Sequence, residues 1–367
     1  MIVKAITLDF FRNYLHLEAA FHPRINVIFG DNAQGKTNLL EAVAYLSSAS
    51  SHRARYDREL IQFGVDHAFV KGEVASRGRD FTLEASLHRG ARRQLLSNGV
   101  RLKNAGELAG ILNTVLFCPE DLYLIRAGAE VRRKFLDQCI CQLRPRYAVA
   151  LAEYKRLREH KTRILRDSAE HPDLLDTLDD FSLRMAQCGA ILVHYRAHFI
   201  KKLRQAAPPI HADCSGGRER LELEYRTVST VTDPEAPPKT LLPQLLDHQE
   251  SHRRAEIESR SCLSGPHKDD LSVSIDGCPA GAYASQGQTR TAALALKLAA
   301  RDIFYQDTQE WPVLLLDDVL SELDSRRQEF VLNRITSGQV FITCCEEEKL
   351  VHLREGNAFY IHDGRLA

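Results

Sequence analysis

The sequence predicts an α/β fold built from both ends of the chain, with a mostly helical domain inserted between them. Strand-like segments fill the first third of the chain, helical periodicity dominates the middle, and buried-looking strands return towards the C-terminal end. At 367 residues the chain exceeds the usual size of a single hydrophobic core, so two domains are expected. We expect residues 1–122 and 264–367 to form one domain and residues 123–263 to form the inserted one.

The N-terminal strands are predicted by short apolar runs, several of which alternate with polar residues. These runs are VKAITLDF, INVIF, AFVKGEV, FTLEASLH and RQLLSNGVRL. The last one contains Asn98-Gly99, a dipeptide typical of the type I′ turn of a β-hairpin.

The inserted domain is predicted by apolar residues at helical spacing. Between Glu130 and Ala207 the one glycine is Gly189, and apolar residues recur three or four positions apart,. Pro145 and Pro172 predict interruptions of this helical block. A strand at LELEYR and a loop at VTDPEAPPKT follow, and the whole block is too long for a connection between two strands.

Strand character returns at DLSVSIDG and then at two continuous apolar runs, PVLLLDD and QVFITCC. Continuous runs of this kind indicate strands that are buried on both faces. We expect a helix in the alanine-rich segment between DLSVSIDG and PVLLLDD.

Composition excludes several classes of protein. Forty-nine basic residues balance forty-nine acidic ones, so a broad positive field is absent and any DNA contact must be local. Nine cysteines without paired CxxC spacing indicate a reduced compartment rather than a zinc site or a disulfide framework. No apolar run approaches membrane-spanning length, and the charged N-terminus is unlike a signal peptide. We therefore expect a cytoplasmic protein with no membrane partner.

A phosphate-binding loop is predicted directly after the strand INVIF. The segment GDNAQGKTNLLEAVAYL matches GxxxxGK[ST], a pattern whose glycines let the backbone close around phosphates, whose lysine reaches the β- and γ-phosphates and whose hydroxyl ligates Mg²⁺. A glycine-rich turn that only caps a helix is the alternative, but it would not require Lys36. The expected nucleotide-binding residues are Gly30, Asp31, Asn32, Ala33, Gln34, Gly35, Lys36, Thr37 and Asn38.

A carboxylate strand is predicted at VLLLDDVLSELD. Four apolar residues place Asp317 at the exposed end of a buried strand, where it can hold a Mg²⁺-bound water together with Thr37. Asp318 follows at once and is the expected catalytic residue, which orients or deprotonates the attacking water. The alternative is that both acids cap a helix that begins near Ser321.

Several segments together resemble ATPases of the ABC/SMC class, and within it the bacterial RecF family of DNA gap-repair ATPases. They extend from Leu8 to Asp324, almost the whole chain, and the motifs GPHKDD and SQGQ make the resemblance specific. The segments are LDFFRNY, GDNAQGKTNLLEA, FCPEDLYLIRAGAEVRRKFLD, SGPHKDDL, YASQGQTRT and LLLDDVLSELD. The resemblance implies an ABC/SMC-type P-loop ATPase head built from both chain ends, with residues 123–263 as an inserted, mainly helical arm.

The resemblance also implies a composite ATP site. In this class two subunits dimerise head to tail around two ATP molecules, so Ser285, Gly287 and Gln288 at a helix N-terminus would face the γ-phosphate held by the other subunit. ATP with Mg²⁺ is the implied cofactor, and an ATP-dependent homodimer follows because ADP lacks that phosphate.

Three further roles are implied by position within the class. Ser321 and Asp324 fall in the D-loop, which crosses the dimer interface, and Arg12 would lie near the phosphates or the adenine. Asp318 stands where most ABC enzymes have glutamate, and Thr343 and Cys344 stand where the switch histidine is usual. We predict a weak, slow ATPase that serves as a switch.

The function implied is that of a recombination mediator, which binds DNA at single-strand gaps, duplex junctions and stalled forks and helps the RecO and RecR mediators load the RecA recombinase, with a role in the SOS response. Basic clusters permit backbone contacts. These clusters are Arg89 to Arg93, Arg132 to Lys134, Lys201 to Arg204, and Arg253 with Arg254.

Other functions fit the sequence less well. An ABC transporter subunit would carry a Leu-Ser-Gly-Gly-Gln segment and the switch histidine, and an SMC-type structural ATPase would need long heptad repeats in place of this short, proline-interrupted block. A fused nuclease would need an added metal-carboxylate domain. His267 of GPHKDD either contacts DNA or ATP or shapes a turn between the domains, and we favour the turn, while Lys268 keeps a functional role open.

Overall fold

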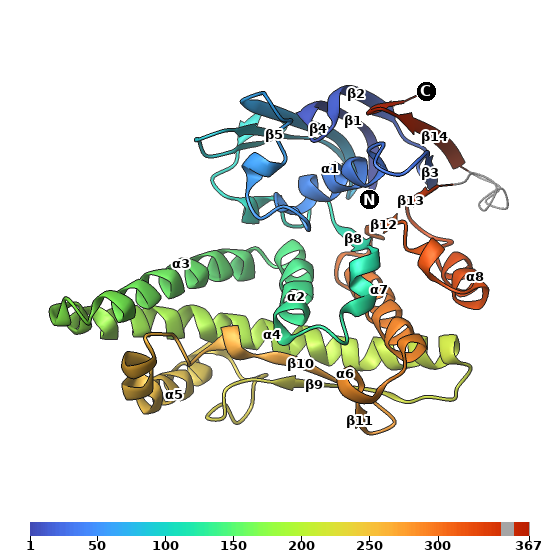
Figure 1. The fold of residues 1–367 in the computed structure, drawn as a ribbon. Helices are drawn as coiled ribbons and strands as arrows, with labels where there is room; N and C mark the ends of the chain where they lie inside the picture. The colour runs from blue at the N-terminus through green and yellow to red at the C-terminus, as the bar shows by residue number, and fades with distance from the viewer. Residues whose placement is uncertain (346–355, 367) are drawn as a thin grey trace. The chain divides into compact units, whose positions relative to one another are not determined.

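The computed structural model describes residues 1–345 and 356–366, which form two compact units (Figure 1). Unit 1 comprises Met1–Tyr123 and Ala293–Ala367, and unit 2 comprises Leu124–Ala292. The α/β class and the assembly of one unit from both chain ends are therefore confirmed.

Unit 1 contains a six-stranded antiparallel sheet with the order β2-β1-β4-β5-β6-β7. Its hairpin turn at Asn98 and Gly99 has positive φ at both residues, as a type I′ turn requires. The strands are β1 (Ile2–Phe11), β2 (Tyr14–Ala20), β4 (His67–Ser76), β5 (Arg79–His88), β6 (Gln94–Ser97) and β7 (Val100–Arg101).

A second sheet in unit 1 has the order β15-β14-β3-β13-β12-β8. All neighbours from β14 to β8 are parallel, and β15 alone is antiparallel to its neighbour. The strands are β3 (Ile25–Phe29), β8 (Thr114–Phe117), β12 (Val313–Asp317), β13 (Val340–Cys344), β14 (Gly356–His362) and β15 (Arg365–Leu366).

Helix α1 (Lys36–Ser48) joins the two sheets into one core. Its buried Leu39 and Val43 belong to the same apolar cluster as Leu8 of β1 and Leu315 of β12. Two further helices complete unit 1: α8 (Ser325–Arg334) and the part of α7 (Gln286–Thr308) that begins at Ala293. The short 3₁₀ turns are η1 (Asp57–Glu59), η2 (Ala105–Leu108), η3 (Pro119–Tyr123) and η6 (Leu320–Glu322).

Unit 2 is mainly helical, as expected for the inserted part of the chain. Its elements also include a three-stranded sheet with the order β11-β10-β9. The helices are α2 (Ala129–Leu143), α3 (Pro145–Asp167), α4 (Leu178–Ser215), α5 (Pro238–Ser259) and α6 (Ala280–Tyr283). The 3₁₀ turns are η4 (Pro172–Thr177) and η5 (Pro266–Lys268). The strands are β9 (Leu221–Arg226), β10 (Asp270–Ile275) and β11 (Cys278–Pro279).

One boundary differs from the sequence expectation. We expected residues 264–292 with the first domain, but they belong to unit 2, which continues to Ala292. The physical reason is strand pairing, because β10 pairs along its whole length with β9 in antiparallel register. The strand that the sequence predicted at DLSVSIDG therefore completes the small sheet of unit 2.

A buried polar network around Arg196 of α4 stabilises unit 2, and Arg196 itself is 2% exposed. Its guanidinium contacts the carboxylates of Asp269 at 3.0 Å and Asp137 at 2.9 Å and donates to the Pro266 carbonyl at 2.6 Å. Asp269 also accepts hydrogen bonds from the hydroxyl groups of Tyr225 and Thr227. The GPHKDD segment is thus part of the packed interior of unit 2.

Candidate functional site

The predicted phosphate loop and both predicted acids lie at one edge of the parallel sheet. Strands β3, β13 and β12 are parallel neighbours, and their register pairs Asp317 with Thr343 and Thr343 with Ile28. The carboxyl ends of parallel strands meet at the same edge, which is where open α/β sheets bind ligands. The loop from Gly30 to Gly35 leaves β3 at this edge and leads into α1.

Two glycines of the loop hold conformations that other residues rarely adopt. Gly30 has φ 143° and Gly35 has φ 123°. A Cβ atom at Gly30 would lie 2.3 Å from the Ile361 carbonyl oxygen, and one at Gly35 would lie 2.8 Å from the Asn13 side chain. Both positions therefore require glycine for steric as well as conformational reasons.

The loop is held in place by residues that the sequence analysis did not single out. The Asn13 side-chain amide donates to the Gln34 carbonyl at 2.8 Å, and the Tyr14 hydroxyl donates to the Gly35 carbonyl at 2.9 Å. From the C-terminal strands, the Gly364 amide donates to the same Gln34 carbonyl at 3.1 Å. The loop is therefore preorganised by two other parts of the chain, and in the sequence only the segment LDFFRNY pointed to one of them.

Lys36 lies at the centre of the loop. Its ammonium group donates to the carbonyl oxygens of Gly30 at 2.5 Å and Asp31 at 2.8 Å, and the residue is 7% exposed. A lysine enclosed by its own loop at the N-terminus of a helix concentrates positive charge, which favours a bound phosphate group.

Thr37, Asp317 and Thr343 form a hydrogen-bonded group beside the loop. One carboxylate oxygen of Asp317 accepts from the Thr37 hydroxyl at 2.8 Å and from the Thr343 hydroxyl at 2.9 Å. Burial raises the pKa of Asp317, while these two hydrogen bonds and the charge of Arg53 act in the opposite direction,. A hydroxyl and a carboxylate next to a phosphate loop are a fitting oxygen donor set for Mg²⁺, so Thr37 and Asp317 are the residues that would hold it.

Asp318 takes a different position from Asp317. Its backbone is left-handed, with φ 52°, which is uncommon outside glycine and asparagine-like residues. Its amide donates to the Thr343 hydroxyl at 2.7 Å, and its carboxylate accepts from the Ser321 hydroxyl at 3.1 Å. Strain of this kind is typical of functional positions.

The idea that both acids cap the following helix is wrong. Helix α8 begins at Ser325, and its N-cap is Asp324, whose side chain accepts from the Arg327 amide at 3.0 Å. Asp324, expected in the D-loop, therefore already has a structural role within its own chain. Ser321 lies in the 3₁₀ turn just before it.

Arg12 is tied to the P-loop helix. Its guanidinium forms a paired interaction with the Glu41 carboxylate of α1, with both N···O distances at 2.8 Å, and donates to the Glu59 carbonyl at 2.9 Å. Glu41 is fully buried, and its pKa is lowered because hydrogen bonds from Arg12 and Ser51 outweigh the burial that would raise it. Arg12 thus contacts protein groups that anchor α1.

The Ser285 cluster forms a reciprocal helix cap in unit 2, whereas the P-loop and the carboxylates lie in unit 1. The Gln288 amide donates to the Ser285 hydroxyl at 3.2 Å, and the Ser285 amide donates to the Gln288 side chain at 2.8 Å. This is a capping box, which presents the N-terminus of α7 in a fixed conformation. Gly287 lies in the first turn of α7 and has no side chain of its own.

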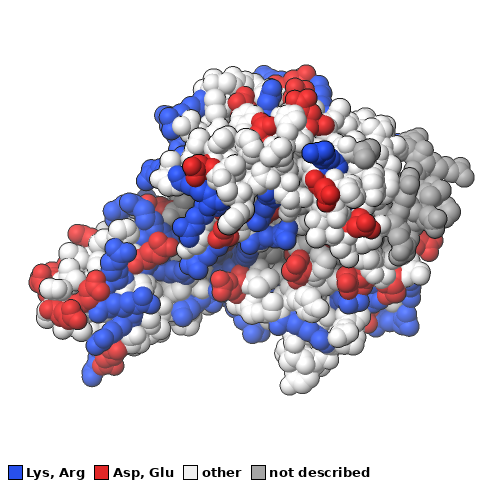
Figure 2. All heavy atoms as spheres, turned by 45° about the horizontal axis from the view of Figure 1, so that its top comes forward, with Lys and Arg blue, Asp and Glu red and all other residues white. Residues whose placement is uncertain are grey.

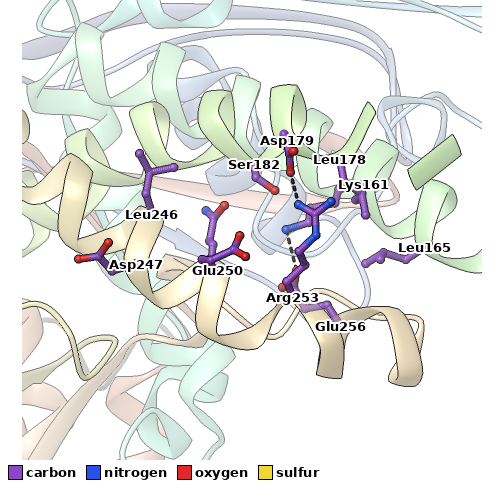
Figure 3. Close-up of a pocket in the computed structure, with 11 residues that line it drawn as sticks. Lys161, Leu165, Leu178, Asp179, Ser182, Leu246, Asp247, Glu250, Arg253 and Glu256 are labelled. Atoms are coloured by element: carbon purple, nitrogen blue, oxygen red, sulfur yellow. Dashed lines mark hydrogen bonds and ion pairs between the residues drawn. The ribbon is translucent and has the colours of Figure 1, made fainter. Parts of the chain in front are cut away.

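A separate pocket of about 270 Å³ lies within unit 2 (Figure 3). Its charges are largely paired: Lys161 contacts Glu256 at 2.7 Å, and Arg253 points towards Asp179 and forms an ion pair with it. These pairs join α3 and α4 to α5, so the pocket is best explained by helix packing.

Each of the predicted basic clusters has at least one member that is paired with an acid. Figure 2 shows Lys and Arg atoms interspersed with Asp and Glu over the face that it presents. Arg132 pairs with Asp270 at 2.7 Å, Lys201 with Glu235 at 2.6 Å, and Arg254 with Glu258 at 2.8 Å. Three clusters that the sequence offered for DNA backbone contacts therefore include arginines or lysines with local structural partners.

Comparison with known proteins places this geometry in a family. The model of the RecF/RecN/SMC N-terminal domain matches residues 2–363. A protein of Agathobacter rectalis named DNA replication and repair protein RecF is 39% identical, with 96% of this chain and 95% of that protein covered. A Listeria innocua protein of the same name is also 39% identical, with 100% and 99% covered.

Solved structures agree with the sequence comparison. A structure of the recombination mediator protein RecF with ATP, described as part of the RecFOR pathway, has a TM-score of 0.90 and 33% identity, and covers 100% of this chain and 97% of that one. An Smc head domain from Pyrococcus furiosus has a TM-score of 0.55 at 16% identity, covering 100% of this chain and 95% of that one, which supports the fold alone. Among the described residues, no helix is long and apolar enough to cross a membrane.

Proposed function

Since this chain belongs to the RecF family of DNA replication and repair proteins, we propose that it is a cytoplasmic, ATP-dependent recombination mediator that binds DNA at single-strand gaps and stalled forks. The observation that carries the proposal is the joining of the Gly30 to Thr37 loop with Asp317 at one sheet edge, through the 2.8 Å hydrogen bond from Thr37. Unit 1 would be the ATPase head and unit 2 the arm.

ATP would be held by the loop, with the ammonium of Lys36 moving from the loop carbonyls to phosphate oxygens. A Mg²⁺ ion held by Thr37 and by Asp317, directly or through water, would neutralise phosphate charge. Asn13 and Tyr14 keep the loop open for this by binding the carbonyls of Gln34 and Gly35. Binding then needs little rearrangement of the backbone.

Hydrolysis would be slow. Asp318 would orient the attacking water or take its proton, but its carboxylate is one methylene shorter than the usual glutamate and accepts a hydrogen bond from Ser321. In the described part of β13, Thr343 and not an imidazole holds the end of the neighbouring strand, and it is engaged with Asp317 and Asp318. A slow hydrolase suits a timed switch better than a motor.

Dimerisation would depend on whether ATP or ADP is bound. The capping box of Ser285 and Gln288 fixes the N-terminus of α7, where Gly287 and the helix dipole would meet the γ-phosphate bound to a second copy. The turn that contains Ser321, with Asp324 behind it, would approach the same interface. Only ATP supplies the phosphate, so ADP would release the dimer.

The ATP-bound dimer would clamp DNA and help RecO and RecR load a recombinase. This part of the proposal is supported by family membership and by the names of the similar proteins, one of which is described as a recombination mediator of the RecFOR pathway.

The test measures the mass of the protein in solution without nucleotide, with ADP and with ATP, in the presence and absence of gapped DNA. We expect a dimer with ATP alone, which Ser285→Arg abolishes while the monomer still binds ATP. Lys36→Arg should weaken ATP binding itself, and Asp318→Asn should prolong the dimer. If Ser285→Arg removes ATP binding from the monomer, the assignment of Ser285 to the partner's nucleotide is wrong.

A further inference from the structure

We propose that the segment between α1 and β4 of unit 1 is a nucleic-acid contact, in which the exposed ring of Phe63 stacks on an unpaired base while arginines beside it hold the phosphate backbone. The inference rests on the proposed DNA binding and specifies which surface recognises the single-stranded part of a gap. Phe63, Arg55 and Arg58, on which the inference rests, take no part in the nucleotide site described above.

Phe63 is the most exposed large apolar side chain among the described residues. It is 99% exposed and sits at the tip of a turn in which the Val65 amide donates to the Gln62 carbonyl at 3.4 Å. Gly64, with φ 86°, supplies the left-handed residue that such a turn requires. The turn presents the ring to solvent and leaves both of its faces open.

The turn is fixed to the sheet. The Gln62 amide donates to the Phe10 carbonyl at 2.8 Å, and Ile61 forms a bridge with Phe11 at the end of β1. On the other side, the Arg89 guanidinium donates to the Val65 carbonyl at 2.8 Å. The exposed ring therefore lies on an anchored turn, so a ligand does not have to order this turn when it binds.

A second aromatic ring in the same segment lies among arginines. Tyr56 is 47% exposed, and the guanidinium carbons of Arg55 and Arg58 lie 5.3 Å and 4.8 Å from its ring centroid. These cation–π contacts hold both side chains near the ring, and both arginines are exposed. Their donors can therefore reach phosphate oxygens while their planes remain stacked.

The surface around this segment is positive because the loop after β5 adds arginines to it. Residues 49–66 carry three arginines and three acids, whereas residues 89–93 of that loop carry three arginines and no acid. Arg55, Arg58, Arg89 and Arg92 are exposed, and the carboxylate of Asp57 is paired with Arg93 at 3.0 Å. Figure 2 shows Lys and Arg atoms on the flank of unit 1 that carries β5 in Figure 1. This is local positive charge on a chain with no net charge.

Nucleic acid fits this surface better than a second protein. Exposed aromatic rings interleaved with arginines are the recognition chemistry of single strands, because every base offers a face for stacking and every phosphate accepts hydrogen bonds. An aromatic hot spot of a protein interface sits among well-packed contacts that exclude water, whereas the neighbours of Phe63 in its turn are Gln62 and Gly64. In a blunt duplex the bases are already stacked on each other, so Phe63 would contribute only where a base is unpaired.

The test measures binding of three fluorescent DNAs of equal length, single-stranded, gapped and blunt duplex, by anisotropy in the presence of ATP. We expect Phe63→Ala to weaken binding to the single-stranded and gapped DNAs about tenfold, as the loss of one base–aromatic stack predicts, and to leave blunt duplex unchanged. Phe63→Trp should restore binding, with quenching of its fluorescence by single-stranded DNA, and Phe63→Leu should not restore it. Arg55→Ala with Arg58→Ala should weaken all three DNAs and flatten the salt dependence.

Val100→Ala is the matched control, because Val100 is an apolar residue of the same sheet that is 67% exposed. Unchanged binding of the gapped DNA by Phe63→Ala, or an equal loss for blunt duplex, overturns the inference and leaves the proposed function standing. A loss of the ATP-dependent dimer in Phe63→Ala without DNA also overturns it, because the ring would then contact a second copy. If the unaltered chain binds none of the three DNAs, the proposed function fails and this inference fails with it.

Discussion

The Thr37 hydroxyl donates a hydrogen bond to the Asp317 carboxylate across 2.8 Å, although the two residues are 280 positions apart in the chain. The contact joins the phosphate loop to the carboxylate strand within one chain. Burial raises the pKa of Asp317 against the hydrogen bonds from Thr37 and Thr343, so its charge is costly to the folded chain.

Asp317→Asn tests this relationship. The amide oxygen can still accept from Thr37, and removing a buried charge relieves desolvation, so thermal stability without ligand should be unchanged or higher. Mg²⁺-dependent stabilisation by ATP should fall sharply, by about 2 kcal/mol or more, as measured by melting with and without Mg²⁺ and ATP. Asp318→Asn is the control, since it should keep that stabilisation and lose at least tenfold in hydrolysis rate. Equal effects of the two changes on ATP binding would contradict the division of roles.

Gly35→Ala tests the loop geometry. A methyl group would meet the Asn13 side chain at 2.8 Å and the Tyr14 hydroxyl at 3.0 Å, on a backbone with φ 123°. We expect loss of ATP binding and about 2 kcal/mol or more of destabilisation, by titration and urea unfolding. Gly78→Ala is matched, because its φ is also positive, at 69°, but nothing lies within 4 Å of the added methyl group, and it should cost only about 1 kcal/mol.

The phosphate loop and Asp317 could be predicted because each is a local pattern with a known chemical demand. The loop was recognisable from its spacing, and a carboxylate after four apolar residues implied the exposed end of a buried strand. Strand β8 was not predicted, because Thr114–Phe117 is four residues long, and its place beside β12 depends on pairing over a long sequence separation. Helix α5 was not predicted because its start at Pro238 lies in a segment whose prolines favour a loop, although proline is well suited to a first helical turn.

The sequence did not reveal how residues outside the motifs support the site. Asn13 orders the loop through the Gln34 carbonyl, and Thr343 links the two acids, but neither belongs to a motif with a fixed spacing. Asp269 is the opposite case. The motif GPHKDD was specific enough to indicate the family, but its Asp269 carboxylate pairs with the buried Arg196. A motif identifies relatives for reasons of folding as well as chemistry.

Arg196→Met tests the buried network of unit 2. Removing the guanidinium leaves the buried Asp269 without its cation and removes one of the two donors to the Pro266 carbonyl, so we expect a loss of about 3–5 kcal/mol in the free energy of unfolding, measured by urea titration. Arg156→Met is the control, because Arg156 forms an exposed i, i+3 pair with Glu153 at 2.9 Å, and a pair of this kind contributes little to stability. A cost for Arg196→Met no larger than that of the control would show that the network does not fasten unit 2.

His267 predicts a pH dependence of stability. Its Nε2 donates to the Cys262 carbonyl at 3.0 Å, and the Tyr154 hydroxyl donates to its Nδ1 at 2.7 Å, so the fold holds the neutral ring and burial lowers its pKa to about 4. The unfolded chain protonates first, near pH 6.5, and stability is therefore lost as the pH falls from about 6.5 towards 4. Between pH 7 and pH 5 the unaltered chain should lose about 2 kcal/mol more in the free energy of unfolding than His267→Gln. Urea titrations of both proteins at the two pH values measure the difference, and parallel losses would mean that the ring takes up its proton at the same pH in the folded and the unfolded chain.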